Sequence, residues 1–161
     1  MLGIQKGLLD SNVMLWALVL LGLYIVDASW KLLPRHIDET VQRWKVSAPF
    51  LPTDYGQLAS FAVLAFSAAI CEELIFRGFM MTYLTSLIGE GQFALCVIVG
   101  IPAIAFTIGH YYQGWSAMIR VFVGGVLFGW IFYISDSILI PIIVHAVIDL
   151  TSGYLSTKFA G

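Results

Sequence analysis

The chain has 161 residues, of which 60% are hydrophobic and 11% are charged, and its mean hydropathy is +0.90. A soluble domain carries roughly 25% charged residues, so this composition predicts an integral membrane protein. The net charge is −2 and there is no basic run, which gives no indication of nucleic-acid binding. At ~20 residues per span, the length allows about five membrane helices. We therefore expect one all-α domain over residues 1–161, a polytopic membrane helix bundle.

The first apolar stretch predicts a spanning helix over about residues 13–30, with Trp30 in the interfacial aromatic belt. The same stretch also resembles a cleaved signal peptide covering residues 1–28, because Lys6 precedes the apolar core and a small-residue site follows it. Asp10 before the core favours a retained helix.

A polar connection follows over residues 32–54 and holds several Lys and Arg residues. Ile37, Val41 and Trp44 recur in it at helical spacing, which predicts an amphipathic helix lying on the membrane surface. The turns after the second and fourth spanning helices carry no Lys or Arg. The positive-inside rule therefore places this connection and the C-terminus in the cytoplasm.

The remaining apolar runs predict four more helices, interrupted by short Gly-rich, aromatic or Ser-Asp-Ser turns. The pair Gly125-x-x-x-Gly129 would let another helix approach the fourth of them closely. The four helices cover about residues 55–88, 93–110, 116–135 and 138–155.

Ionisable residues interrupt three of these apolar helices. Each charge at bilayer depth costs about 2.5–3.5 kcal/mol on insertion scales. We therefore expect these ionisable residues to pair with one another and to serve a function. Glu73 and Arg77 are four residues apart and can pair on one helix face, which leaves Glu72, about 100° away, free for another partner. The third and fifth helices add His110 and the pair His145-x-x-x-Asp149. We expect Glu72 and His110 to lie at similar depths in the membrane. His145 reaches the same depth only if its helix begins deeper in the membrane or tilts.

Three motifs occur in order: Glu72-Glu73-x-x-x-Arg77, Phe106-x-x-x-His110 and His145-x-x-x-Asp149. Together they resemble the signature of the CPBP family, the CAAX-protease and bacteriocin-processing membrane proteins, over roughly residues 58–155.

This resemblance implies an intramembrane glutamic endopeptidase in a bacterial or archaeal inner membrane, with a membrane-anchored protein or peptide as its substrate. It implies that Glu72 acts as general base with His110, that His145 and Asp149 stabilise the oxyanion, and that Glu73, Arg77 and Phe106 support the site, without a cofactor or metal. Asp149 stands where many members have Asn, so it either is protonated or only holds His145. The short chain argues against a prenyl-cysteine substrate, and the oligomeric state stays open.

Alternatives remain at this stage. Glu72, His110, His145 and Asp149 are acceptable Zn²⁺ ligands, although no H-E-x-x-H motif is present. The chain could also be a non-catalytic scaffold or a bacteriocin immunity factor that masks a partner. An ion-coupled carrier is a further reading, but no inverted repeat is visible.

Overall fold

The computed structural model describes residues 10–47, 50–89 and 91–160 and contains only helices within them. Lys6, on which part of the signal-peptide alternative rests, lies outside these residues. The helices long and apolar enough to span a membrane number five in this part of the chain, as predicted. Their bounds are α1 (Ser11–Lys31), α3 with η1 and α4 (Tyr55–Ile88), α5 (Gln92–Gly109), α6 (Trp115–Ser135) and α7 (Leu139–Ala160). The chain is therefore an integral membrane protein.

The ends of these helices follow local capping signals. The Asp10 carboxylate accepts a hydrogen bond from the backbone N–H of Asn12, and Asp54 accepts one from Gln57, so that α1 and α3 each begin at an acidic cap. Gly89, at φ 72°, ends α4 in a conformation that favours glycine. The last helix runs to Ala160 and not to residue 155, so Lys158 lies inside it and not in a tail.

The second spanning helix changes its winding halfway. α3 (Tyr55–Glu73) continues into the π-helical segment η1 (Leu74–Met81) and then into α4 (Thr82–Ile88) without a break. The wider turns begin directly after Glu72 and Glu73. Short π segments inside α-helices occur frequently at functional sites.

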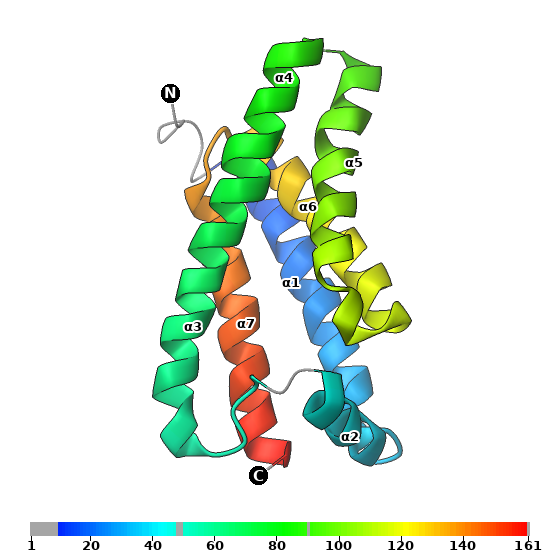
Figure 1. The fold of residues 1–161 in the computed structure, drawn as a ribbon, viewed down its shortest axis with the longest axis vertical. Coiled ribbons are helices and arrows are strands. Elements are labelled where there is room, and N and C mark those ends of the chain that lie inside the picture. The colour runs from blue at the N-terminus through cyan, green and yellow to red at the C-terminus, as the bar shows by residue number, and fades with distance from the viewer. Residues whose placement is uncertain (1–9, 48–49, 90, 161) are drawn as a thin grey trace.

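The predicted surface helix is α2 (Ile37–Ser47), and it lies at the same end of the bundle as the C-terminal end of α7 (Figure 1). The hydroxyl of Thr40 ties it to the end of α1 by donating to the carbonyl of Lys31 at 3.0 Å. Because Arg120 lies 3.6 Å from Asp27, the start of α6 is at this end too. The charged residues that determine orientation thus gather at one end, as the sequence predicts.

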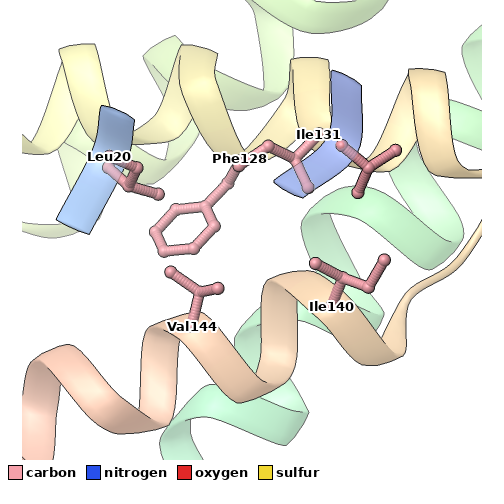
Figure 2. Close-up of a cluster of buried hydrophobic side chains, with 6 residues drawn as sticks. Leu20, Phe128, Ile131, Ile140 and Val144 are labelled. Atoms are coloured by element: carbon pink, nitrogen blue, oxygen red, sulfur yellow. The ribbon is translucent and has the colours of Figure 1, made fainter. Parts of the chain in front are cut away.

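Two interfaces form most of the core. Side chains of α1, α6 and α7 interlock around Phe128 and Ile131 (Figure 2). On the other side, α5 packs against η1 and α6, where a Cβ added to Gly125 would lie 3.3 Å from Ala103 and one added to Gly129 would lie 3.0 Å from Val99. The predicted close approach at the two glycines therefore exists, and its partner is α5. Large apolar side chains such as Phe93, 84% exposed, cover the outside and suit lipid contact.

The packing of α7 against α3 at Gly153 gives the first prediction. A Cβ on Gly153 would lie 2.2 Å from Cε1 of the buried Phe61 ring, so we expect Gly153→Ala to destabilise the protein by about 1–3 kcal/mol through overpacking. Denaturant titration in detergent micelles measures the loss. The matched variant Gly124→Ala, which places its Cβ at least 4 Å from any other group, should match the parent or exceed it slightly. Equal stability of the two variants would contradict the packing described here.

Candidate active site

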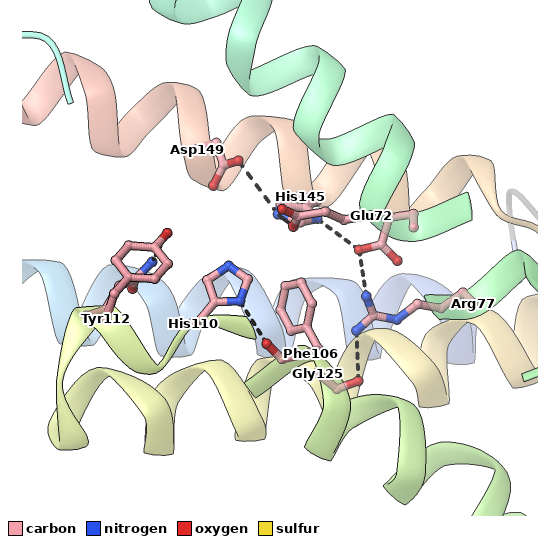
Figure 3. Close-up of polar contacts among 10 residues, drawn as sticks. Glu72, Arg77, Phe106, His110, Tyr112, Gly125, His145 and Asp149 are labelled. Atoms are coloured by element: carbon pink, nitrogen blue, oxygen red, sulfur yellow. Dashed lines mark hydrogen bonds and ion pairs between the residues drawn. The ribbon is translucent and has the colours of Figure 1, made fainter. Parts of the chain in front are cut away.

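A buried polar cluster joins three helical segments, and Figure 3 shows Arg77, His145 and Asp149 as parts of it. Its centre is Glu73. It is the last residue of α3, and its side chain is 0% exposed. One carboxylate oxygen, Oε1, accepts from Nη1 of Arg77 at 2.9 Å and from Nδ1 of His145 at 2.8 Å. The predicted Glu73–Arg77 pair is therefore confirmed, and His145 of α7 is attached to it.

Arg77 extends the cluster to α6. Its second amino group, Nη2, donates to the backbone carbonyl of Gly125 at 3.0 Å. The guanidinium carbon lies 5.2 Å from the ring centre of Phe106 and 5.3 Å from that of Phe128, so the cation sits against two aromatic faces. Arg77 is thus neutralised by Glu73, hydrogen-bonded to the backbone and shielded from lipid.

The other ring nitrogen of His145 faces two further carboxylates. Nε2 lies 3.7 Å from Oε2 of Glu72 and 3.6 Å from Oδ2 of Asp149, distances of ion pairs rather than of short hydrogen bonds. The Glu72 and Asp149 side chains are 30% and 33% exposed, whereas the ring of His145 is 9% exposed. The imidazole is therefore fixed from behind by Glu73, while the two partly exposed carboxylates are left accessible.

His110 is oriented independently of that cluster. It caps the end of α5, and its Nδ1 lies 2.8 Å from the carbonyl oxygen of Phe106. A carbonyl only accepts, so Nδ1 carries the proton in this contact and a neutral ring presents its lone pair at Nε2. The ring lies 4.4 Å from that of Phe106 and stacks near Tyr112 at 6.1 Å, measured between centres.

The structure gathers most of the residues that the motifs predict. One continuous cluster contains Glu72, Glu73, Arg77, His145 and Asp149. The position of His145 near the start of its helix does not keep it from the others, because its ring bonds directly to Glu73. Phe106 links the two parts, with its ring against both Arg77 and His110. Among the described side chains, no carboxylate oxygen comes within 4.0 Å of a His110 ring nitrogen, so Glu72 and His110 are not in direct contact.

Sequence reasoning missed three contributions to the site. Phe128 stacks on His145 at 5.3 Å, the Gly125 carbonyl holds Arg77, and Tyr112 covers His110. Only Gly125 carried a signal, as part of the glycine pair, and that signal concerned helix packing. Within the described residues, no three His, Cys, Asp or Glu side chains are arranged to hold a metal ion.

A membrane helix bundle that holds accessible carboxylates and imidazoles on a buried charged support has the groups of a membrane-embedded hydrolase. The family model for type II CAAX prenyl endopeptidase Rce1-like proteins matches residues 54–151, more than half of the chain. The chain therefore belongs to this family of CAAX-type intramembrane proteases. No curated protein and no solved structure matches the chain.

The buried support gives the second prediction. Arg77→Met leaves the Glu73 charge in an apolar interior with His145 as its remaining partner, and breaking a buried pair in this way costs about 3–5 kcal/mol. Adding Glu73→Gln removes that charge and keeps an oxygen that accepts from His145, so the double variant should regain most of the loss.

Unfolding in detergent micelles measures both variants, and Arg43→Met is the control. Arg43 also pairs with a Glu four residues away, but this pair is 62% exposed on both sides, so its loss should cost about 0–1 kcal/mol. A double variant less stable than Arg77→Met alone would contradict the role given to the buried charge.

Proposed function

We propose that this chain is a glutamate-dependent intramembrane endopeptidase, which cleaves a peptide bond of a membrane-anchored protein or peptide. The observation that carries the proposal is the contrast between two adjacent carboxylates. Glu73 is fully buried and bonded to Arg77 and His145, whereas Glu72 is 30% exposed and its Oε2 lies 3.7 Å from Nε2 of His145. A carboxylate that is accessible in a site poor in water can act as a general base near neutral pH.

In the proposed reaction, a water molecule between Glu72 and His110 gives a proton to the Glu72 carboxylate, and its oxygen forms a bond to the carbonyl carbon of the substrate. The lone pair at Nε2 lets His110 orient this water. The proton then passes to the leaving nitrogen as the C–N bond breaks, which yields a carboxylic acid and an amine.

We assign to His145 and Asp149 the stabilisation of the negative charge that develops on the carbonyl oxygen of the substrate. Since Nδ1 of His145 donates to Glu73, a donor at Nε2 requires the imidazolium form. Asp149 donates only when protonated. Removal of one oxyanion-hole donor from a hydrolase typically lowers kcat by about 10²–10³.

The substrate's peptide bond must be extended at this site, because a carbonyl bonded inside a helix is shielded from attack. Membrane attachment brings the substrate to the depth of the site. The family's description refers to prenylated substrates. We propose a membrane-anchored substrate and do not assign it a prenyl group.

The third prediction tests the base. Glu72→Gln keeps the shape of the side chain and removes its proton acceptor, so we expect cleavage to fall by about 10²–10⁴ while the folded protein accumulates normally. Comparing the termini of membrane proteins from cells that carry either form measures the loss and identifies the substrate. Asp38→Asn, the same type of change on the exposed side of α2, is the control and should leave the profile unchanged.

Two outcomes would replace the proposal. If Glu72→Gln restores every phenotype of a gene deletion while the protein termini stay the same, the chain acts by binding, as a scaffold or immunity factor. If cleavage is lost on treatment with a zinc chelator and returns with Zn²⁺, a metal-dependent mechanism takes its place.

The fourth prediction concerns Asp149. Asn can always donate a hydrogen bond, so Asp149→Asn should keep kcat within about tenfold of the parent, whereas Asp149→Leu should lower kcat by about 10²–10³. Cleavage kinetics on the substrate that the comparison of termini identifies would measure kcat for both variants. Gel filtration would check that both variants fold. An Asn variant as inactive as the Leu variant would show that the Asp149 charge, and not a donated hydrogen bond, is what catalysis requires.

A further inference from the structure

A cavity of about 870 Å³ lies between the surface helix α2 and the helix bundle. Its walls come from the end of α1, from α2 and the loop that follows, from the 3-10 helix η2 (Tyr111–Gln113) and the start of α6, and from α7. Residues of each wall include Lys31, Arg43, Trp44, Arg120 and Asp149. Ligand pockets in proteins measure about 300–1,000 Å³, so a cavity of this size can hold a peptide segment or a small molecule.

The cavity reaches the candidate active site through Asp149. This residue is part of the cavity wall, and its Oδ2 lies 3.6 Å from Nε2 of His145. α1 and α2, which also contribute to the walls, precede residue 54, where the match to the family model begins. The N-terminal helices thus add a chamber beside the site that the matched region does not itself contain.

The walls hold three Lys or Arg side chains and three carboxylates, but the pairing among them leaves both arginines incompletely bonded. Asp27 pairs with Lys31 and also lies 3.6 Å from Nε of Arg120, so one carboxylate serves two cations. Arg43 donates from Nη2 to Glu39 at 2.6 Å, but its Nη1 reaches only the hydroxyl of Ser116, at 3.5 Å. A guanidinium has five N–H donors, so both arginines keep donors available to a ligand.

The rest of the lining is mixed. Trp30, Trp44 and Trp115 add aromatic surface, and Glu39 and Asp149 add acceptors. An extended polypeptide uses all three kinds of group, because its N–H groups need acceptors, its carbonyls need donors and its side chains need apolar or aromatic contact.

We propose that this cavity binds the extended polar segment that flanks the scissile bond of the substrate, and that Arg43 and Arg120 select an acidic side chain in it. This inference rests on the proposed function. It assigns Arg43 and Arg120 to substrate selection, outside the catalytic cluster.

The experiment uses the Glu72→Gln protein in nanodiscs of uncharged lipid, so that binding is measured without cleavage. The probes are synthetic peptides with an apolar helix of about 20 residues, a length that spans a bilayer, and a short Gly-Ser tail at either end. The tail carries two Asp or, in the matched probe, two Lys. A photo-crosslinking amino acid replaces Trp44 in the cavity wall or, as the positional control, Val46, which is 80% exposed and not part of the wall.

We expect the Asp tail to crosslink at position 44 at least about fivefold more than the Lys tail, and position 46 to show no preference. Arg43→Glu should reduce the preference to about twofold or less. Lys45→Glu makes the same charge change on the same helix away from the cavity, so it should leave the preference in place. Arg43 is exposed, so its replacement is compatible with folding.

Equal effects of Arg43→Glu and Lys45→Glu, or equal crosslinking at positions 44 and 46, would overturn the inference. So would complete loss of the crosslink on adding anionic lipid, because the cavity would then be a headgroup site. The protein with native Glu72 is tested on the same probes for cleavage. Selective crosslinking without cleavage refutes the proposed function alone, whereas cleavage without any preference between tails refutes the selection by Arg43 and Arg120 alone.

Discussion

The site depends on one buried oxygen, Oε1 of Glu73, which accepts from Arg77 and from His145. Through Arg77 the same charge is connected to the Gly125 carbonyl, so one carboxylate fixes the relative positions of α3, η1, α6 and α7. Ionised groups at membrane depth are tolerated when they satisfy one another, and here the mutual satisfaction also sets the geometry. The helices cannot shift along one another without leaving a charge unpaired.

The fold could be predicted largely from sequence because the membrane restricts the choice. Backbone polar groups in lipid must bond within their own segment, so each apolar run of sufficient length becomes a helix. This rule gave the five spans to within a few residues at most ends, and helical spacing in a polar stretch gave α2. The end of α7 was placed too early, since the mixed sequence after residue 155 carries Lys158, which the helix nevertheless accommodates.

The residues that form the polar cluster could be predicted from the sequence, but the bonds among them could not. Four-residue spacing gave the Glu73–Arg77 pair, because both residues lie on one helix. The bond between Glu73 and His145 joins residues 72 positions apart and depends on how α3 and α7 pack, which no local pattern encodes. For the same reason, Phe128 was missed, although its ring contacts both Arg77 and His145. In a hydrophobic helix, an aromatic residue in the site looks the same as one facing lipid.

The neighbouring residues Glu72 and Glu73 have the same side chain and opposite environments. Successive residues of an α-helix point about 100° apart, so one faces the packed interior between η1 and α7 while the other reaches its edge. Glu73 is held between two donors as part of the buried support, whereas Glu72 is partly exposed. Since both depend on the same helix turn, the anion that fixes His145 also fixes the position of the proposed base. The same helix turn thus places Glu73 and the proposed base Glu72, so a shift of this turn would displace both side chains.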